Sequence, residues 1–405
     1  MKYSRILKEY WGYDSFRGIQ REIIESIGAG RDTLGLMPTG GGKSITFQVP
    51  ALASDGLCVV ITPLIALMKD QVANLRSRGI KATAIYSGMR AKDVVSALEN
   101  CIFGDYKFLY VSPERLSSEL FLLKIRKVNV SLITVDEAHC ISQWGHDFRP
   151  DYLRLGRVRQ ELGYPQTVAL TATATPRVQQ DLGAAFSIAP EHRIILPPYR
   201  GNITRICRPV ADRMPALLEF LGSGQQLPAI VYCRTRKETE WLAGELATRG
   251  YLAAHYHAGL PADQRELLQD AFLRNEITVL VATIAFGMGI DKPDVRAVVH
   301  WSTPSSPESY LQESGRAGRD SAPCTSLILL HAPDLVEARN RILAAEPDAE
   351  GVLRCVRWLL PAGQRVVSLW ELGTTCDVPD DVPTRALMAL EGSIVVESKG
   401  SKYYC

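Results

Sequence analysis

The sequence predicts an α/β protein with two lobes, each built around a parallel β-sheet. Short apolar runs alternate with longer amphipathic segments, which is the pattern of successive strand–helix–strand units. A break rich in Pro and Gly, LPPYRGNITR at 196–205, divides this pattern, which then starts again. At 405 residues the chain is longer than one ordinary core requires, which favours two domains and a remainder.

Each expected strand is an apolar run, as in strands that are buried on both faces of a sheet. In the first lobe the runs lie at 33–37, 57–62, 82–86, 107–111, 131–136 and 167–171. In the second lobe they lie at 229–233, 252–257, 279–283, 297–301 and 325–330. We therefore expect a first lobe over 1–200, a linker at 196–205 and a second lobe over 201–335.

Residues 336–405 follow a different pattern and predict a small C-terminal domain. Apolar residues between 352 and 359 share one helical face, and further short helices are expected at 368–373 and 383–392. A hairpin is expected to turn near Lys399 and Gly400. Three helices followed by a hairpin are in the order of a winged helix, and a small helical cap on the second lobe fits the pattern equally well.

The composition is that of a globular protein. Hydrophobic residues make up 46% and charged residues 22%, with a net charge of +2, so nucleic-acid binding would depend on local basic patches. The nine cysteines include no CxxC pair, which argues against a disulfide framework and a zinc knuckle and fits a reducing cytosol. The sequence has neither a signal-peptide pattern nor about eighteen consecutive apolar residues, so we expect a cytoplasmic protein without a membrane span.

A glycine-rich segment, MPTGGGKS, follows the first strand and precedes a helical pattern. Successive glycines let backbone N–H groups turn toward a phosphate at a helix N-terminus. Lys43 would add a charge for the β- and γ-phosphates, and Ser44 a hydroxyl for Mg²⁺. The candidate nucleotide-binding residues of this loop are Thr39, Gly40, Gly41, Gly42, Lys43 and Ser44.

The stretch VDEAHCISQWGHDFRPDY, at 135–152, begins with two acids at the end of an expected strand. Ligands of open α/β sheets bind at the carboxyl ends of strands, so Asp136 and Glu137 belong beside the phosphate loop. Asp136 would then hold Mg²⁺, and Glu137 would position and deprotonate the attacking water. A zinc site is disfavoured because His139 and Cys140 are adjacent and no paired Cys/His cluster supplies further ligands.

The segments MPTGGGKS, TPLIALMKDQ, VDEAHCISQWGHDFRPDY, ALTATAT, IAFGMGID and QESGRAGRD occur in this order over roughly residues 1–330. In this combination the sequence resembles the RecQ family of superfamily 2 DNA helicases. The resemblance implies two RecA-like lobes with an ATP cleft between them. It also implies a 3′→5′ helicase that uses ATP and Mg²⁺, translocates on single-stranded DNA and unwinds duplex DNA in repair or recombination.

The resemblance extends to further residues of the ATP site. Tyr13, Arg17 and Gln20 are similar to the family's adenine-binding segment, and Asp291 to a residue that binds nucleotide as the lobes close. Thr171 and Thr173 resemble the motif that links hydrolysis to lobe movement. Among the candidate catalytic residues are Lys43, Asp136, Glu137, Gln312, Arg316 and Arg319. Either arginine can be the finger on the γ-phosphate, and we favour Arg319.

The resemblance also implies which residues contact DNA. Strand-end loops of both lobes would follow the sugar-phosphate backbone of one strand without reading its sequence. The candidates in these loops are Thr62, Pro63, Lys69, Arg115, Arg234, His257 and Thr283. An aromatic-rich loop would sense single-stranded DNA through Gln143, Trp144, His146, Phe148 and Arg149. Expected partners are single-stranded and tailed or forked duplex DNA, whereas protein partners such as a single-strand-binding protein cannot be read from the sequence.

One departure from the family pattern concerns zinc. RecQ proteins typically follow the second lobe with a four-cysteine zinc module, and here only Cys324, Cys355, Cys376 and Cys405 remain, at unsuitable spacings. We therefore expect no zinc. A DNA-stimulated ATPase or translocase with little unwinding is the alternative enzyme. A non-catalytic DNA-binding scaffold is the other alternative, disfavoured because the candidate catalytic residues are all intact.

Overall fold

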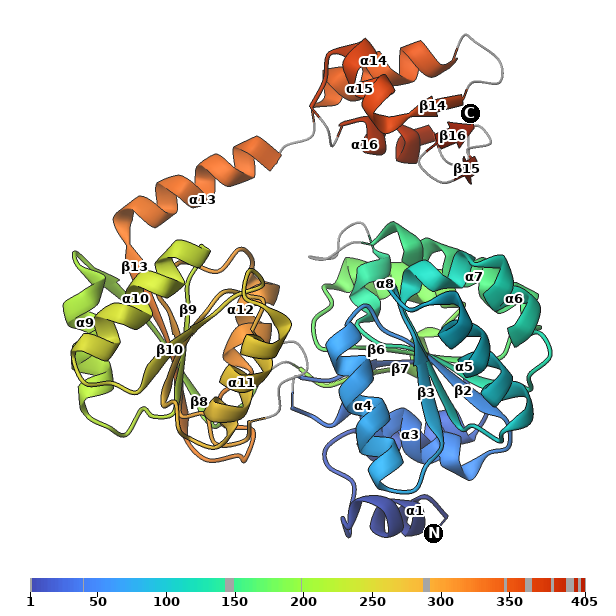
Figure 1. The fold of residues 1–405 in the computed structure, drawn as a ribbon, viewed down its shortest axis with the longest axis horizontal. Coiled ribbons are helices and arrows are strands. Elements are labelled where there is room, and N and C mark those ends of the chain that lie inside the picture. The colour runs from blue at the N-terminus through green and yellow to red at the C-terminus, as the bar shows by residue number, and fades with distance from the viewer. Residues whose placement is uncertain are drawn as a thin grey trace. The chain divides into compact units, whose positions relative to one another are not determined.

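The computed structural model describes residues 2–38, 40–142, 149–197, 199–286, 292–345, 348–360, 366–379, 382–390, 397–399 and 402–404. The chain forms two compact units, Met1–Ala332 and Pro333–Cys405. The first unit contains two separate parallel sheets with helices around each (Figure 1). Within the described residues no helix is long and apolar enough to cross a membrane.

The first sheet has seven parallel strands in the order β3-β4-β2-β5-β6-β1-β7. The strands are β1 Thr33–Leu36, β2 Leu57–Ile61, β3 Ala82–Ile85, β4 Phe108–Val111, β5 Val130–Val135, β6 Gln166–Thr171 and β7 Arg193–Ile195. Because β5, β6 and β1 are neighbours and parallel, their carboxyl ends meet at one edge of the sheet. That edge holds the candidate catalytic residues of the first lobe.

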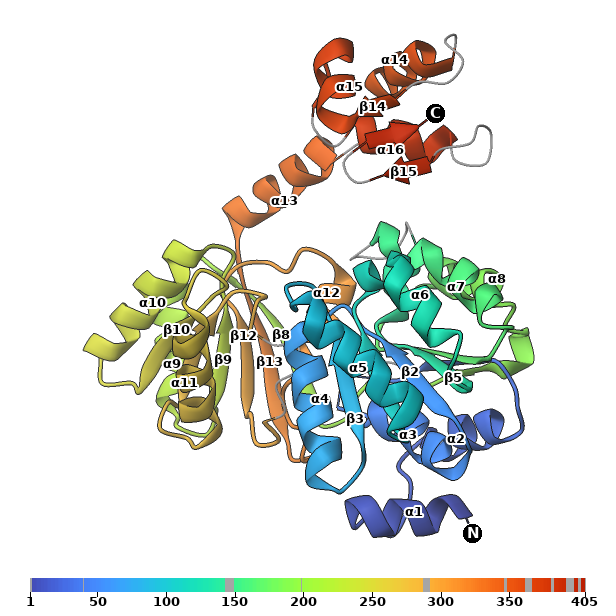
Figure 2. The same ribbon diagram turned by 45° about the vertical axis from the view of Figure 1, so that its right-hand side comes forward.

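Helices cover both faces of this sheet (Figure 2). The α-helices are α1 Lys2–Trp11, α2 Gln20–Gly28, α3 Lys43–Ala53, α4 Ile65–Ser77, α5 Ala91–Phe103, α6 Glu119–Ile125, α7 Leu155–Glu161 and α8 Pro176–Phe186. Short 3₁₀ helices lie at η1 Pro113–Ser117, η2 Ala138–Ile141, η3 Pro150–Arg154 and η4 Pro190–His192. Alternate residues of each strand face opposite sides. In β2, Val59 packs with α5 to α8, whereas Val60 packs with α2 to α4.

The second sheet has six parallel strands in the order β10-β11-β9-β12-β13-β8. They are β8 Ile203–Val210, β9 Ala229–Tyr232, β10 Ala253–Tyr256, β11 Val279–Ala282, β12 Ala297–His300 and β13 Cys324–His331. The helices of this lobe are α9 Arg213–Gly222, α10 Arg236–Thr248, α11 Ala262–Leu273 and α12 Pro307–Ser314. Two apolar clusters fill the space between this sheet and its helices.

Every apolar run that predicts a strand is a strand in the structure, but β7 and β8 were not expected. The expected linker at 196–205 is wrong at its end, because β8 begins at Ile203. Most of β8 is exposed or half-buried, so it has no continuous apolar run. It is a strand because it pairs along its full length with β13, more than a hundred residues later.

Helix α13, Ala332–Ala345, starts at the last residue of the first unit and crosses the expected domain boundary at 335/336. The remaining elements are α14 Ala349–Leu359, β14 Val366–Ser368, α15 Leu369–Cys376, α16 Val382–Leu390, β15 Glu397–Lys399 and β16 Lys402–Tyr404. The three helices and the antiparallel β15–β16 pair occur in the expected order. Strand β14 was not expected, and it pairs with β16 in a three-stranded sheet. The winged-helix interpretation stays a prediction.

Candidate active site

The phosphate loop connects β1 to α3 through three glycines. Gly40 and Gly42 have φ values of 78° and 73°, a region that side chains other than glycine rarely adopt. A Cβ at Gly41 would lie 2.9 Å from the Pro38 carbonyl oxygen. In the described part of the loop no side chain caps the first N–H groups of α3, which therefore suit an anion. Thr39 lies outside the described residues.

Gln20, the first residue of α2, attaches the segment before it to this loop. Its Nε2 donates to the carbonyl oxygens of Gly41 at 3.0 Å and Gly42 at 3.3 Å, and its Oε1 accepts from the Arg17 backbone N–H at 2.8 Å. The Arg17 guanidinium lies 5.4 Å from the Tyr13 ring centroid. Both ends of the Gln20 amide thus contact protein in this structure, and its contact with adenine stays a prediction.

Lys43, Asp136 and Glu137 come together beneath the phosphate loop. Lys43 is the first residue of α3, and the two acids follow β5 directly. The Lys43 ammonium group lies 3.1 Å from Glu137 Oε1 and 3.9 Å from Asp136 Oδ1. Glu137 has a left-handed backbone (φ 49°), and its N–H donates to Asp136 Oδ1 at 3.0 Å. This turn directs both carboxylates toward the same ammonium group.

Burial and close charges shift the pKa values of this cluster. Burial raises the pKa of Asp136 to about 6, with Lys43 opposing the rise and Glu137 adding to it. For Lys43, burial alone would lower the pKa, but Glu137 and Asp136 outweigh it, so the pKa is raised and the group stays charged. Two carboxylates facing one ammonium group can accept a divalent cation. The Ser44 hydroxyl and the Asp136 carboxylate are oxygen ligands that Mg²⁺ prefers.

The Thr residues of ALTATAT connect to the acid pair through His139. His139 Nδ1 lies 2.9 Å from Thr171 Oγ1 and 3.5 Å from Glu137 Oε2. The Thr171 hydroxyl donates to the Thr173 carbonyl oxygen at 3.0 Å. The side chains of His139, Thr171 and Thr173 are all buried. A change at Thr173 can therefore reach Glu137 through two hydrogen bonds and the contact between His139 and Glu137.

The two arginines after α12 point in different directions. Arg316 is 7% exposed and hydrogen-bonds with the Tyr232 hydroxyl inside the second lobe. Arg319 lies at the phosphate loop, since a Cβ on Gly40 would be 3.1 Å from Arg319 Cγ. Arg319 also lowers the pKa of Lys43 through its charge, although the acids dominate that group. Arg319 is thus the arginine that reaches the candidate phosphate site.

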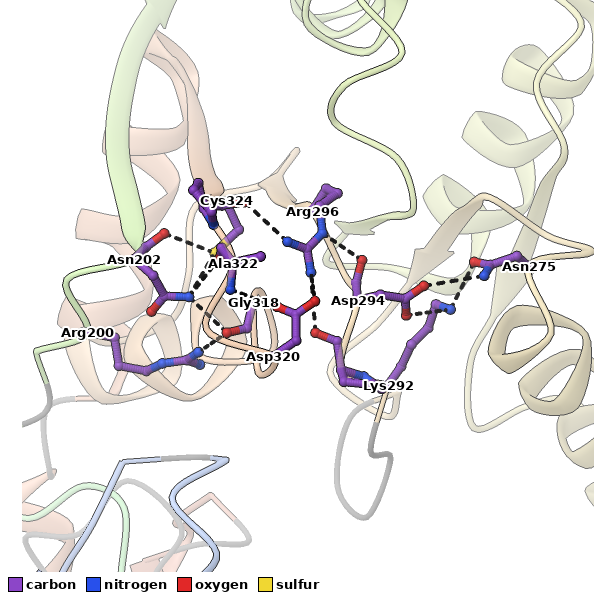
Figure 3. A network of polar contacts seen from close by, with 12 residues as sticks. Arg200, Asn202, Asn275, Lys292, Asp294, Arg296, Gly318, Asp320, Ala322 and Cys324 are labelled. Carbon is purple, nitrogen blue, oxygen red and sulfur yellow. Dashed lines mark hydrogen bonds and ion pairs between the residues drawn. The ribbon is translucent and has the colours of Figure 1, made fainter. Parts of the chain in front are cut away.

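The arginine turn, which we define as residues 315–322, is held by two residues from the segment before β8 (Figure 3). The Arg200 guanidinium donates to the carbonyl oxygens of Gly315, at 2.9 Å, and Gly318. Asn202 Nδ2 donates to the carbonyl oxygens of Gly318 at 2.8 Å and Ala322 at 2.9 Å. These contacts fix the backbone on both sides of Arg319.

Only a glycine fits at position 318, because the residues that hold the turn leave no room for a side chain there. The φ of Gly318 is 56°, and a Cβ there would lie 2.5 Å from both Asn202 Nδ2 and Cys324 Sγ. Asp320, within the arginine turn, is also held in place, because Arg296 Nη2 lies 2.6 Å from Asp320 Oδ2. The ion pair with Arg296 lowers the pKa of the Asp320 carboxyl. Sequence reasoning did not find Arg200, Asn202 or Arg296, which lie outside the recognised segments.

Comparison with known proteins places these features in a family. Residues 17–182 match the family model described as DEAD/DEAH box helicase, and residues 212–321 match the helicase conserved C-terminal domain. The chain is 43% identical over 369 residues to the "Probable ATP-dependent DNA helicase RecS" of Bacillus subtilis, covering 90% of this chain and 74% of the relative. The chain belongs to the RecQ and RecS family of ATP-dependent DNA helicases.

Other relatives in this family are longer than the chain. It is 42% identical to the "ATP-dependent DNA helicase RecQ" of Pasteurella multocida over 85% of its own length but only 54% of that protein. Among solved structures, S. cerevisiae Dbp5 bound to RNA and ADP BeF3 matches with a TM-score of 0.63 at 20% identity, covering 84% of this chain and 90% of that one. The Mycobacterium smegmatis helicase Lhr matches with a TM-score of 0.66 at 19% identity, covering 99% and 60%. These two likenesses support the RecA-like fold of the lobes.

A cavity of 520 Å³ lies beside the phosphate loop in this RecQ- and RecS-type chain. Its lining includes Tyr13, Arg17, Gln20, Gly40, Gly41, Gly42, Ser44, Arg319 and Asp320. Sequence reasoning missed Trp11 and the residues Gln71, Asn74 and Arg78, which also line it. Residues 71, 74 and 78 are spaced as one face of α4 and its end, and this polar stripe, which starts at the last residue of TPLIALMKDQ, was the available signal. Gln312, on α12, is half-buried and does not line the cavity.

In the first lobe, the structure brings some of the candidate DNA-contacting residues together. Lys69 Nζ lies 5.3 Å from the Tyr86 ring centroid, and Arg115 Nε donates to the Tyr86 carbonyl oxygen at 3.1 Å. Thr62, next to Pro63, is 1% exposed, and its hydroxyl has no hydrogen-bond partner among the described residues. The Arg149 backbone N–H donates to the Cys140 carbonyl oxygen at 2.9 Å. The other four candidates of the aromatic-rich loop lie outside the described residues: Gln143, Trp144, His146 and Phe148.

The second lobe gives less support to the DNA-contact predictions. His257 is 4% exposed and its Nε2 lies 2.9 Å from Glu240 Oε1, so its side chain contacts protein. Thr283 accepts a hydrogen bond from the Ala285 N–H at 3.4 Å. Arg234 donates its backbone N–H to Ser302 Oγ at 3.3 Å. Asp291 lies outside the described residues. The DNA contacts of this lobe stay predictions.

Proposed function

We propose that the protein hydrolyses ATP to move along single-stranded DNA in the 3′→5′ direction and to unwind duplex DNA. The observation that carries this proposal is the cluster of Lys43, Asp136 and Glu137 beneath the phosphate loop, with Arg319 reaching the same loop. Membership of a family of DNA helicases supports a DNA substrate. The two lobes would act on DNA in repair or recombination, in a bacterium at the nucleoid in the cytoplasm.

The side chains of the cluster have separate roles in this proposal. Ser44 and Asp136 would hold Mg²⁺, which supplies positive charge to the phosphates when it is bound. Glu137 would orient the attacking water and accept its proton, because its carboxylate is held at the site by Lys43 and by a left-handed backbone. Lys43 would leave the acids for the β- and γ-phosphates once nucleotide enters.

Arg319 is the arginine finger in this proposal, and Arg316 supports the second lobe. A guanidinium that neutralises the charge forming on the γ-phosphate must reach the phosphate loop, which Arg319 does. Arg316 instead hydrogen-bonds with Tyr232 in its own lobe. Arg200 and Asn202 position the finger by fixing the backbone of the arginine turn. They act through Arg319 and are positioning residues.

DNA binding would be coupled to hydrolysis through η2. This short helix follows Glu137 directly, and its Cys140 accepts a hydrogen bond from Arg149, just after the segment 143–148. Ser142 Oγ donates to Asp181 Oδ2 on α8, and the Arg149 N–H donates to Cys140. A displacement of that segment by DNA would therefore be passed to η2 and to the acid beside it. His139, which joins Glu137 to Thr171, would pass the same movement to β6.

The first lobe would bind the sugar-phosphate backbone through Lys69 and Arg115. Both side chains gather around Tyr86, near the ends of β3 and β4. Basic side chains that contact the phosphates of a nucleic acid bind it with little dependence on its sequence and strong dependence on salt concentration. We therefore expect single-stranded and tailed or forked duplex DNA to be bound without sequence preference.

The decisive experiment measures ATP hydrolysis and strand separation on duplexes with a 3′ or a 5′ tail, with Lys43→Ala as the inactive control. We expect DNA-stimulated hydrolysis and separation from the 3′ tail, both lost in Lys43→Ala. Hydrolysis without separation would identify the protein as a translocase with little unwinding. Absence of DNA-stimulated hydrolysis would identify a binding scaffold, and separation from a 5′ tail alone would contradict the polarity.

A further inference from the structure

Two histidines and a glutamate, side chains that commonly bind metal ions, lie close together in the second lobe, apart from the ATP site. His255 and His257 at the end of β10 and Glu240 on α10 each place a ligand atom within 4.8 Å of the other two. We propose that this trio binds a divalent transition-metal ion of the first row, such as Co²⁺, Ni²⁺ or Zn²⁺. The proposal does not depend on ATP hydrolysis or on DNA binding.

The local fold explains why these three side chains meet. His255 and His257 are two residues apart along an extended segment, so their side chains project from the same face. Their rings are nearly parallel, with an interplanar angle of 19° and centroids 5.5 Å apart. Helix α10 packs on β10, which brings Glu240 Oε1 to 2.9 Å from His257 Nε2. The Glu240 side chain is 53% exposed, so the cluster has an open side.

The three ligand atoms would have to move only slightly closer together to bind one metal ion. Zn²⁺ binds imidazole nitrogen and carboxylate oxygen at roughly 2.0–2.2 Å, so tetrahedral ligand atoms are about 3.4 Å apart. His257 has a fixed position because its side chain is 5% exposed, whereas the Glu240 side chain is 53% exposed and can rotate toward the ion. His255 is half-buried beside them. Water would complete the coordination on the open side.

A second observation concerns the other ring nitrogen of His257. Its Nδ1 is buried and has no hydrogen-bond partner among the described residues. A buried imidazole nitrogen without a partner is costly, so the Nε2 contact with Glu240 alone does not satisfy the polar groups of this ring. The Arg236 guanidinium lies nearby, since a Cβ on Gly259 would be 2.9 Å from Arg236 Nη1 and 3.1 Å from His257 Nδ1. That positive charge will keep the affinity below that of a four-ligand structural zinc site.

The ligand set also separates this site from the proposed Mg²⁺ site. Two imidazoles and one carboxylate suit Zn²⁺, Ni²⁺ and Co²⁺, whereas Mg²⁺ prefers an all-oxygen environment. Excess Mg²⁺ should therefore leave binding at the histidine trio unchanged. Binding there can be measured without nucleotide and without DNA, so its failure and the failure of the helicase proposal are distinguishable.

The test is a titration of the full, untagged chain with Co²⁺, followed by the visible absorption of the bound ion. With excess Mg²⁺ present to compete at the acid pair, we expect one saturable Co²⁺ site without a thiolate-to-cobalt charge-transfer band, because the ligands are nitrogen and oxygen. His255→Gln and Glu240→Gln should each weaken binding about tenfold or more. His192→Gln, which changes a histidine of η4 in the first lobe, is the matched control and should bind as the wild type does.

Thermal unfolding gives a readout that does not use absorption. A ligand that binds only the folded state raises the unfolding temperature, and the rise grows with the logarithm of the ligand concentration divided by Kd. Co²⁺ should raise the unfolding temperature of the wild type and of His192→Gln more than that of His255→Gln or Glu240→Gln. The proposal is overturned by the absence of saturable binding, by wild-type affinity in both ligand variants, or by a spectrum dominated by thiolate ligation.

Discussion

The phosphate loop and the arginine turn both direct a cationic side chain at the same site, but the protein holds them in different ways. The phosphate loop is set mainly by its own glycines, with Gln20 as a nearby support. The arginine turn depends on Arg200 and Asn202, which lie 115 to 120 residues earlier in the chain. The conformation of the phosphate loop is thus encoded locally, whereas the conformation of the arginine turn depends on residues far away in the sequence.

The largest effect should follow from removing the proposed base. Glu137→Gln keeps the shape of the side chain but cannot accept a proton, so we expect the ATP hydrolysis rate to fall roughly 10³-fold. ATP binding, measured with a fluorescent nucleotide, should remain, because Gln keeps the size of the side chain and Lys43 is unchanged. Retention of more than a tenth of the activity would mean that another group activates the water.

The two arginines of the turn sharpen the comparison directly. Arg319→Ala should lower kcat about 10³-fold and leave the unfolding temperature nearly unchanged, because the finger acts on the γ-phosphate. Arg316→Ala should instead lower the unfolding temperature, because it removes a buried hydrogen bond with Tyr232. Steady-state kinetics and thermal unfolding of both variants check this. The reverse pattern would assign the finger to Arg316.

Much of this site could be predicted from the sequence, and the reason differs between the lobes. Asp136 and Glu137 follow β5, and Lys43 begins the helix that follows β1. Parallel strands bring their carboxyl ends together, so the motif spacing and the fold class sufficed for these three residues. The hydrogen bonds of Asn202 to the arginine turn could not be predicted in the same way. Asn202 precedes β8, an exposed edge strand without an apolar run, and its partner is defined only by the pairing of β8 with β13.

The same limit applies to the direction of a side chain. Arg316 and Arg319 are three residues apart, and their spacing alone leaves both as candidates for the finger. The structure separates them because Gly318, between the two, has a positive φ that redirects the chain after Arg316. That conformation depends on Asn202 and Cys324, which would meet any side chain at position 318.

A positioning role for Asn202 predicts a smaller, specific loss. Asn202→Ala removes the hydrogen bonds to Gly318 and Ala322, so the finger is less often in place, and we expect kcat to fall roughly tenfold to a hundredfold. KM for ATP should change little, because Asn202 does not contact the phosphate loop. Arg208→Ala is the matched control, since Arg208 lies on β8 and pairs with the exposed Glu219.

The result for Asn202→Ala can also be separated from a folding defect. If Asn202 only stabilised the second lobe, Asn202→Ala would lower the unfolding temperature and leave kcat per folded molecule unchanged. A combined Asn202→Ala and Arg319→Ala variant gives a further check. When one residue acts through the other, the double variant should be no slower than Arg319→Ala alone.

The final prediction concerns the stability of the protein without nucleotide. The pKa of Asp136 is raised from its usual value of 3.8 to about 6, mainly by burial, so its charged form is destabilising in the folded state. A shift of that size corresponds to about 3 kcal/mol at most when the pH is above 6, and to nothing below about pH 4, where Asp136 is protonated both folded and unfolded. Asp136→Asn should therefore be more stable than the wild type at pH 7, although inactive.

Thermal unfolding between pH 4 and pH 7 measures this difference. The stability advantage of Asp136→Asn should shrink as the pH falls through the pKa of Asp136, because the protonated acid and the amide are both neutral. Asn can still accept the backbone N–H bond of Glu137, so the turn is kept. Asp55→Asn, at an exposed carboxylate, controls for the substitution itself. An advantage that is constant with pH would show that packing, and not buried charge, limits the stability of the acid pair.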